Sequence, residues 1–369
     1  MDPSANREYD FIDGLRGIAI LMVLACHHLY FNPASNSAVR FLGNVFLTSG
    51  LGVNLFFTIS GFLIAWPFWK RKVNHSKETA PPGYAGRRFW KIYPPLFLSV
   101  LLLTPIYILW KGDAPLYLHT AIQWLTGAAF LIPVSGDFNP VMWSLVVEIH
   151  FYLVMPLLFL VTKPFSPRTT LWVITLFFFL APEITKAVTG LAPTFYPQIC
   201  DPFPTGLDSF CLGVCLAGID NFKIWDKRWA RFGDAGWILL PAGLVLLAWL
   251  RMHPEHQTAW RTATAGWVFN LGAGALLCYA ADPKNPRAQV LCSPWLRWCG
   301  IISYEWYLFH QPLVYISREA FGHSHGNVLK YAMIIGLPLL TSLTLSALVY
   351  RFFSLPILKF GRSRNQARK

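Results

Sequence analysis

Long apolar segments recur from one end of this 369-residue chain to the other. Segments of about twenty apolar residues match the hydrocarbon thickness of a bilayer, so the chain is predicted to cross a membrane several times. The composition agrees, because 54% of the residues are hydrophobic and only 13% are charged. The charged share is about half that of soluble domains. The sequence therefore predicts an all-α, polytopic integral membrane helix bundle without a sizeable soluble domain.

About ten transmembrane helices are predicted, with both termini in the cytoplasm. A cytoplasmic segment (1–13) precedes a transmembrane domain (14–356), and a basic cytoplasmic tail (357–369) follows. Residues 116–134, between Pro115 and Pro133, are predicted to form an interfacial or re-entrant helix on the outer side. The predicted spans cover residues 14–32, 43–69, 92–110, 141–162, 170–188, 203–220, 235–250, 262–281, 298–319 and 330–353.

The net charge of +13 supports this orientation and does not indicate a nucleic-acid partner. Basic residues concentrate on the cytoplasmic side of membrane proteins. With both termini cytoplasmic, all but seven of the 31 Lys and Arg residues fall on that side, the exceptions being Arg40, Lys111, Lys186, Arg251, Arg261, Arg318 and Lys330. The 7 cysteines do not form a pattern typical of a disulfide framework or a metal site.

The first predicted helix carries ionisable residues on one face. Arg16 and His27 are eleven residues apart, so they share a helix face and lie about 16 Å apart along the axis. Asp13 stands one turn before Arg16. Charged side chains that face lipid are costly, so this face is predicted to point into the protein interior or a wet cavity. In the alternative interpretation, the Arg16 side chain extends to the membrane surface and His27 is a hydrogen-bonded core residue without a catalytic role.

Two later spans carry polar stripes. Ser144, Glu148 and Tyr152 recur every fourth residue and therefore share one helix face. Glu148 is a natural partner for His27, which is predicted to lie at a similar depth on a neighbouring helix. In the span 298–319, a second face carries three polar residues, which either join helices together or line a cavity; they are Ser303, Tyr307 and His310.

The predicted cytoplasmic loop over residues 70–91 holds seven basic residues and ends in Arg87, Arg88 and Lys91. Such a cluster beside a membrane is often a solvated anchor on anionic lipid. It is also suited to a phosphorylated ligand, because Arg binds phosphate with two parallel hydrogen bonds and Lys acts as a point charge.

Together these motifs resemble the membrane-bound acyltransferase family 3, from about Tyr9 to Pro356. The resemblance rests on five motifs in order: Arg16 and His27 behind Asp13-Gly-Leu, Phe56–Leu63, Arg87-Arg88 before Ile-Tyr-Pro, Trp143–Glu148, and Ser303–His310. Two positions depart from the family pattern, since Lys91 and Gly206 stand where relatives commonly carry arginine. The chain is expected to be the stand-alone form, without the esterase-like extracytoplasmic domain of many members.

The resemblance implies transfer of an acyl group, most often acetyl, from cytoplasmic acyl-CoA to a hydroxyl outside a bacterial inner membrane. His27 would be the general base and Glu148 would orient it. Arg16, Arg87, Arg88 and Lys91 would hold the CoA phosphates. The cavity would be lined by Asp13, Ser60, Trp143, Ser144, Ser303, Tyr304, Tyr307 and His310. Acyl-CoA would be the donor substrate, with neither a metal nor a permanently bound cofactor.

The acceptor is expected to be a cell-envelope polysaccharide such as O-antigen or exopolysaccharide, although peptidoglycan and a macrolide-like molecule also fit. Direct attack and a covalent acyl relay both remain open, as does the oligomeric state. The rival hypothesis is a proton-coupled transporter, in which Arg16, His27, Glu148 and Asp208 form a relay within the membrane. Inverted repeats would favour a transporter, and the sequence contains none that we detect.

Overall fold

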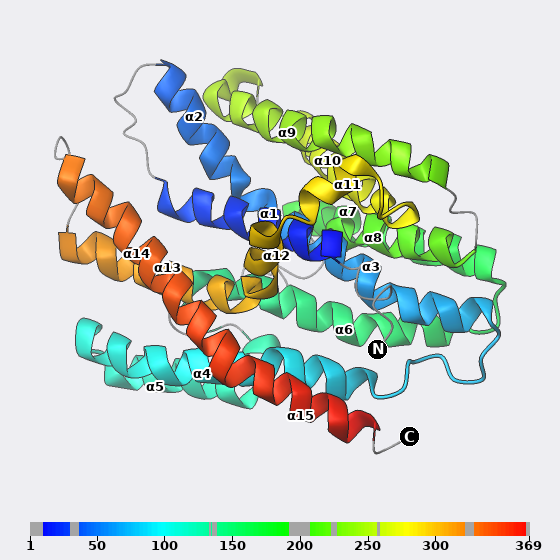
Figure 1. Cartoon of the computed structure of the whole chain (residues 1–369), viewed down its shortest axis with the longest axis horizontal. Coiled ribbons are helices and arrows are strands. Elements are labelled where there is room, and N and C mark those ends of the chain that lie inside the picture. Colours follow the sequence, from blue (N-terminus) through cyan, green and yellow to red (C-terminus); the bar gives the residue numbers. More distant parts are fainter. Residues whose placement is uncertain are drawn as a thin grey trace.

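Helices make up all the regular secondary structure that the computed structural model describes, which covers residues 10–29, 37–132, 134, 139–191, 207–222, 227–256, 259–321 and 328–366 (Figure 1). The all-α prediction is confirmed. The α-helices are α1 (Asp10–His28), α2 (Ser37–Thr48), α3 (Gly52–Val73), α4 (Tyr84–Lys111), α5 (Ala114–Thr126), α6 (Trp143–Val161), α7 (Pro167–Leu191), α8 (Leu207–Asn221), α9 (Ala230–Met252), α10 (Ala259–Leu277), α11 (Pro286–Leu291), α12 (Pro294–Ile301), α13 (Ser303–Phe321), α14 (Val328–Val349) and α15 (Leu355–Gln366).

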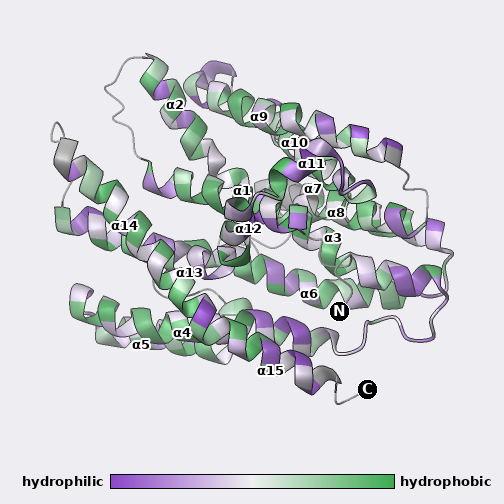
Figure 2. Ribbon diagram, viewed as in Figure 1, coloured by the Kyte–Doolittle hydropathy of each residue, from purple (hydrophilic) through white to green (hydrophobic). Residues whose placement is uncertain are grey.

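Seven helical stretches of the described residues are long and apolar enough to cross a membrane: Asp10–His28, Ser37–Val73, Tyr84–Lys111, Pro140–Val161, Ala230–Met252, Thr264–Ala281 and Ala332–Arg364. Each overlaps one of the predicted spans. Two shorter apolar helices, Pro167–Ala181 and Ser209–Asn221, overlap the predicted spans 170–188 and 203–220. The total of ten spans and the orientation of the termini stay predictions. Figure 2 shows hydrophobic residues along most helices and hydrophilic residues gathered towards one end of the bundle.

The predicted continuous span over 298–319 is wrong in one respect, because the helix breaks at Ile302 into α12 and α13. Figure 1 shows α12 lying across the direction of α13. The physical reason is the close packing of α12 on α1. A Cβ at Gly300 would collide with the carbonyl oxygen of Asp13, so the two backbones nearly touch there. The break lets α12 cross α1 while α13 runs beside it.

Two glycines of α1 allow the same close approach. A Cβ at Gly14 would collide with the carbonyl oxygen of Leu291, and a Cβ at Gly17 with that of Leu296. Small residues at such positions let helix backbones meet in a membrane, where packing drives association. The two glycines that surround Arg16 therefore fix α1 against α11 and α12, and with it the position of the arginine.

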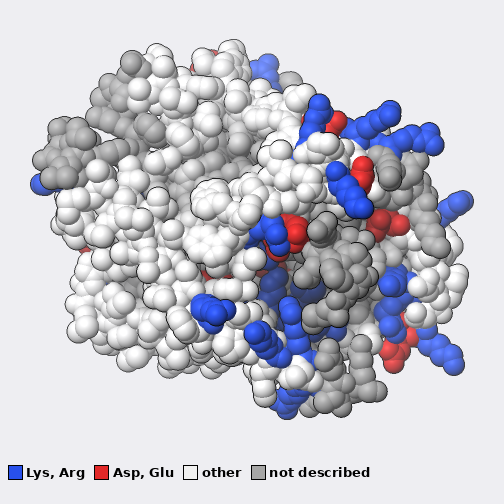
Figure 3. Space-filling view, viewed as in Figure 1, with Lys and Arg blue, Asp and Glu red and all other residues white. Residues whose placement is uncertain are grey.

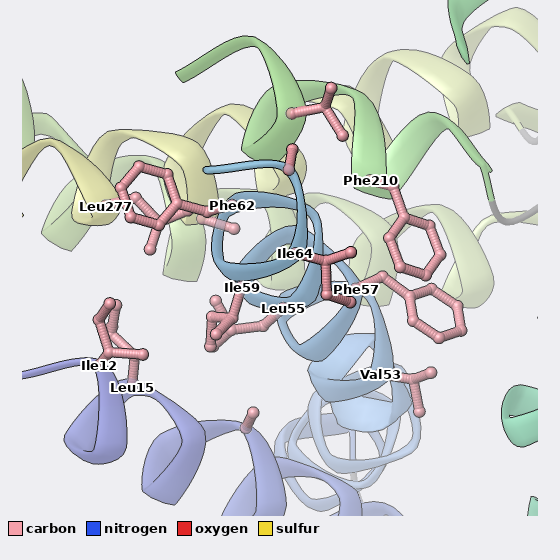
Figure 4. Packing of buried hydrophobic residues seen from close by; sticks show 14 of the residues in the cluster. Ile12, Leu15, Val53, Leu55, Phe57, Ile59, Phe62, Ile64, Phe210 and Leu277 are labelled. Carbon is pink, nitrogen blue, oxygen red and sulfur yellow. The ribbon is translucent and has the colours of Figure 1, made fainter. Parts of the chain in front are cut away.

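Helix α3 lies at the centre of the core. It packs against α1, α6, α8 and α10, and Figure 4 shows its apolar side chains pointing outward towards Ile12 and Leu15 of α1, Phe210 of α8 and Leu277 of α10. The rings of Phe57 and Phe210 stack with centroids 4.6 Å apart. The central position of α3 brings its polar residue Ser60 to the middle of the bundle.

Helix α5 covers most of the segment 116–134 that was predicted to be interfacial or re-entrant. The Asp113 side chain caps its first turn by accepting from the amide of Leu116 at 3.0 Å, and Gly127 ends it in a left-handed conformation with φ of 81°. Its 13 residues extend about 20 Å, which is shorter than a bilayer core. The helix packs against α4.

Lys and Arg side chains gather at one end of the bundle. Figure 3 shows most of those visible at the end where both termini lie. At this end, the segment predicted as a basic tail over 357–369 is largely helical, because α14 continues through a π-helical turn (Tyr350–Ser354) into α15. This gathering of Lys and Arg side chains at one end agrees with the charge asymmetry of the sequence. Arg16 lies in the half of α1 that is nearer to this end.

Candidate active site

A narrow polar cavity lies between α1, α3, α4, α6 and α13. Its volume is about 70 Å³, enough for a few water molecules. The structure brings eight of the predicted site residues around it: Arg16, Ser60, Lys91, Ser144, Glu148, Ser303, Tyr304 and Tyr307. The remaining lining is mostly apolar and comes from Val53, Phe56, Phe57, Ile59, Leu63, Ile92 and Leu145. Residues far apart in the sequence therefore meet here.

Two basic side chains, Arg16 and Lys91, line the cavity. Arg16 Nη2 donates to Ser303 Oγ at 3.0 Å, and its Nη1 lies 3.8 Å from Asp13 Oδ1. Lys91 interacts electrostatically with Arg16 and with Glu148. Two basic side chains are thus held near one another inside the bundle, and the carboxylates of Asp13 and Glu148 lie within electrostatic reach of them.

Glu148 also lines the cavity. Its Oε1 accepts from Ser60 Oγ at 3.2 Å and also from the Tyr152 hydroxyl, one turn further along α6. Glu148 and Tyr152 of the predicted polar stripe of α6 therefore contact each other on one face of the helix. Among the described hydrogen bonds of Glu148, none goes to His27, the partner suggested by the sequence.

Ser144 and Tyr307 meet in the lining of the cavity. The Tyr307 hydroxyl donates to the carbonyl oxygen of Val141 at 2.7 Å and lies 2.7 Å from Ser144 Oγ. Nearby, Tyr304 donates to the carbonyl oxygen of Ile92 at 3.0 Å. These bonds fasten α13 to α6 and α4, and they leave the hydroxyl groups facing the cavity.

The histidines of α1 and α13 form a pair. His27 Nδ1 lies 2.9 Å from Nε2 of the fully buried His310. His310 Nδ1 lies 2.8 Å from the carbonyl oxygen of Tyr307 and 3.1 Å from that of Trp306. A carbonyl oxygen only accepts, so His310 Nδ1 carries the proton and its Nε2 is the acceptor. His27 therefore donates from Nδ1, which leaves His27 Nε2 as the basic nitrogen of the neutral ring.

The remaining predicted residues lie outside this cavity. Arg88 is half-buried, with its guanidinium 5.8 Å from the ring centre of Tyr84 and 5.4 Å from that of Tyr152. Arg87 points elsewhere, because it is exposed and donates to the carbonyl oxygen of Pro82. Adjacent residues on a helix point about 100° apart, which explains the divergence.

A larger cavity of about 400 Å³ lies beside the first. It is lined by Leu47, Thr48, Gly50, Leu51, Val53, Asn54, Trp143, Leu247, Leu250, Arg251 and Gly266. Trp143, predicted to line the site, lies here with 44% of its surface exposed. Val53 lines both cavities.

Comparison with known sequences decides the family. Residues 9–351 match the Acyl_transf_3 family, which is described as an acyltransferase domain. The chain belongs to this acyltransferase family. The family that the five sequence motifs indicated is thereby confirmed.

Three similar proteins are named as acyltransferases or O-acetyltransferases. This acyltransferase-family chain is 24% identical over 368 residues to O-acetyltransferase OatA of Staphylococcus aureus (strain NCTC 8325 / PS 47), covering 95% of this chain and 57% of OatA. It is 23% identical over 383 residues to peptidoglycan O-acetyltransferase OatA of Listeria monocytogenes, covering 95% and 56%. Acyltransferase MdmB of Streptomyces mycarofaciens is 26% identical over 239 residues, or 58% of each chain. The chain therefore spans a little over half the length of the two OatA proteins. No solved structure matches.

One acid near the family motifs was not assigned to the site from the sequence. Glu305 is only 3% exposed and interacts electrostatically with Arg16 and Lys91. Its sequence signal was a carboxylate inside an apolar helix, which marks a functional candidate. Glu305 adds a negative charge beside the two cations of the cavity. The side chain of Asp208, included in the transporter hypothesis, lies outside the described residues.

Proposed function

We propose that this acyltransferase moves an acetyl group from cytoplasmic acetyl-CoA to a hydroxyl of a cell-envelope polysaccharide on the opposite face of an inner membrane. The observation that carries the proposal is a polar path along α1. The path begins at the cations Arg16 and Lys91, passes Glu148 and the Ser144–Tyr307 pair, and reaches His310 and His27. Cations at one end and a base at the other suit an anionic donor and an alcohol acceptor.

The cationic end is suited to the phosphates of acetyl-CoA. Arg16 and Lys91 line the cavity, and the half-buried Arg88 lies nearby on the same helix as Lys91. The cavity holds only a few water molecules as it stands. The pantetheine arm would therefore have to displace the apolar side chains around the cavity to extend along α1 over the distance of about 16 Å that separates Arg16 from His27. Arg87, exposed at the start of α4, would make a first contact with the donor.

The histidine pair provides the base. His27 Nε2 takes the proton of the acceptor hydroxyl as its oxygen attacks the thioester carbonyl, because a neutral alcohol is a poor nucleophile. The new C–O bond forms and the C–S bond breaks, so CoA leaves as a thiolate. His27 Nε2 then returns the proton to this thiolate. While His27 is charged, its Nδ1–H donates to His310, which keeps the ring oriented as a carboxylate does in a hydrolytic triad.

Hydroxyl groups near the path can stabilise the developing oxyanion. Tyr307 lies one turn before His310 and its carbonyl oxygen binds that ring. Its hydroxyl and that of Ser144 share the acceptor Val141, so either donor can turn towards a bound thioester. Donors held in place before the reaction lower the barrier without reorganisation.

The acceptor class is supported by the relatives. Two relatives are named O-acetyltransferases, and the Listeria protein is named a peptidoglycan O-acetyltransferase. A cell-envelope polysaccharide is therefore the acceptor that we propose for this chain. Acetyl-CoA is a substrate in this scheme and no bound cofactor is required.

The experiment uses permeabilised membranes that contain the protein, with radiolabelled acetyl-CoA and a crude envelope-glycan fraction. The test variant is His27→Ala and the control is Ser317→Ala, since Ser317 lies on α13 outside the narrow cavity and donates to the carbonyl oxygen of Ile334. We expect label in the glycan with wild type and Ser317→Ala, and a loss of at least about 100-fold with His27→Ala, as for a general base. Equal transfer by His27→Ala would contradict the role of His27, and no transfer by wild type would contradict the function.

A further inference from the structure

The larger cavity, of about 400 Å³, has no role in the path of the donor. Its volume lies within the range of small-molecule binding sites, roughly 300–1,000 Å³. It is formed where four chain segments meet: the end of α2 with the start of α3, the start of α6, the end of α9, and α10. In the predicted topology all four meet on the outer side, where the acceptor would be.

The cavity adjoins the path at two places. Val53 lines both cavities, and the ring of Phe57, which lines the narrow one, packs edge-on against Trp143 with centroids 6.2 Å apart. The cavity wall also contacts α1 close to the histidine pair. Cys26, the residue before His27, donates to the carbonyl oxygen of Leu47 at 3.2 Å. A ligand in the larger cavity would therefore lie beside the reacting end of the path.

The lining has the chemistry of a saccharide site with one anionic group. Trp143 offers a half-exposed aromatic face on which a sugar ring can lie, and Asn54 offers an amide that donates to Asn270 of α10 at 3.4 Å among the described residues. Sites of this kind combine apolar walls with a few polar groups that orient the ligand.

Arg251 supplies the charge. It is exposed in the last turn of α9, and within the described residues no carboxylate is paired with it. It is also one of the few basic residues that the charge pattern predicts to lie outside. Arginine binds carboxylate and phosphate with two parallel hydrogen bonds, so a cavity with this single cation favours a ligand with a negative charge.

We propose that this cavity is the acceptor site and that Arg251 selects a saccharide bearing an anionic group. The inference rests on the proposed function, because it names the acceptor class of that same transfer. The anion is either a carboxylate of the sugar or a phosphate attached to it, and both would be held by the same guanidinium.

Gly266 gives direct experimental access to the cavity. A Cβ at this position would meet no atom within 4 Å, so Gly266→Cys places a thiol in the cavity without collision. The thiol is treated with two methanethiosulfonates of similar size, the anionic sulfonatoethyl and the cationic trimethylammonioethyl reagent. The unsubstituted protein, whose Cys26 adjoins the wall, is the control for labelling elsewhere.

The expected result is a preference for the anionic reagent that depends on Arg251. The ratio of anionic to cationic labelling rates should fall at least about threefold when Arg251→Gln is added, because a nearby charge attracts one reagent and repels the other. An unchanged ratio would overturn the charge selection. This result does not depend on catalysis, so it stands even if wild type fails to transfer and the proposed function is wrong.

The second measurement tests whether the cavity serves the acceptor. Labelled Gly266→Cys should lose transfer to the envelope glycan at least about tenfold while acetyl-CoA binding stays within twofold, since the donor lies in the narrow cavity. Gly336→Cys, treated with the same reagent, should transfer like wild type, because a Cβ there meets nothing within 4 Å and Gly336 lines neither cavity. If labelled Gly266→Cys transfers normally, or loses donor binding equally, the cavity is not the acceptor site.

Chemical treatment of the acceptor glycan shows whether the anionic group is a carboxylate or a phosphate. One glycan sample has its carboxylates reduced to alcohols and another is dephosphorylated, and each is compared with the untreated sample. A rise in the acceptor KM of wild type after one treatment, absent in Arg251→Gln, identifies carboxylate or phosphate. If neither treatment changes the KM of wild type, the proposal of an anionic acceptor is wrong.

Discussion

Replacement of His310 by alanine should slow the chemical step without weakening donor binding. The 2.9 Å contact between His27 Nδ1 and His310 Nε2 becomes a charge-assisted hydrogen bond when His27 takes a proton. Such bonds contribute about 1.5–3 kcal/mol, which corresponds to a fall in kcat of about 10- to 150-fold. The KM for acetyl-CoA should stay within twofold, because His310 does not line the narrow cavity.

The assay is steady-state transfer of labelled acetyl groups, with His310→Gln and Ser317→Ala as companions. The glutamine oxygen can accept from His27, so His310→Gln should recover most of the rate. Ser317 lies on the same helix and bonds to the carbonyl oxygen of Ile334 in α14, so Ser317→Ala should be neutral. Thermal unfolding in detergent checks that each variant is folded. Equal losses for alanine and glutamine would refute the acceptor role, as would a normal rate for His310→Ala.

Two further predictions follow from the packing and charge of the bundle. Lys91→Ala should raise the Kd for acetyl-CoA at least about tenfold by removing a charged hydrogen bond to phosphate, whereas Lys91→Arg should keep the Kd near that of wild type. Binding of labelled acetyl-CoA to the purified proteins measures both Kd values, and equal affinities for Lys91→Ala and wild type would exclude a phosphate contact. Gly300→Ala should destabilise the protein by about 1–3 kcal/mol or more, because its Cβ collides with backbone. Gly336→Ala, whose Cβ would meet nothing within 4 Å, should unfold like wild type. Thermal unfolding that shows no difference between the two variants would contradict the close contact of α1 and α12.

Much of the candidate site could be predicted from the sequence because helix periodicity is local. The spacing of Ser144, Glu148 and Tyr152 sets one face of α6, and the structure uses that face to hold Ser60 and to line the cavity. Similarly, Ser303 and Tyr307 of α13 share a face, and both line the cavity. Patterns of this kind depend on the geometry of one helix alone.

The pairing between helices could not be predicted in the same way. The sequence suggested Glu148 for His27, whereas the structure places His27 on His310 and Glu148 on Ser60 and Tyr152. Relative depth and rotation are set by close backbone contacts, such as the one at Gly300, and no single-helix pattern records them. The break at Ile302 was missed for the same reason, since it results from the packing of α12 on α1.

The central claim is that an acetyl group passes through the protein from the Arg16 end of α1 to the His27 end. Sealed vesicles of opposite orientation test it most directly, with labelled acetyl-CoA added only outside and envelope glycan enclosed within. Inside-out vesicles should label the enclosed glycan, while right-side-out vesicles should not, because only the former present the cytoplasmic face to the donor. Labelling that occurs only when donor and acceptor are on the same side of the membrane would contradict the account.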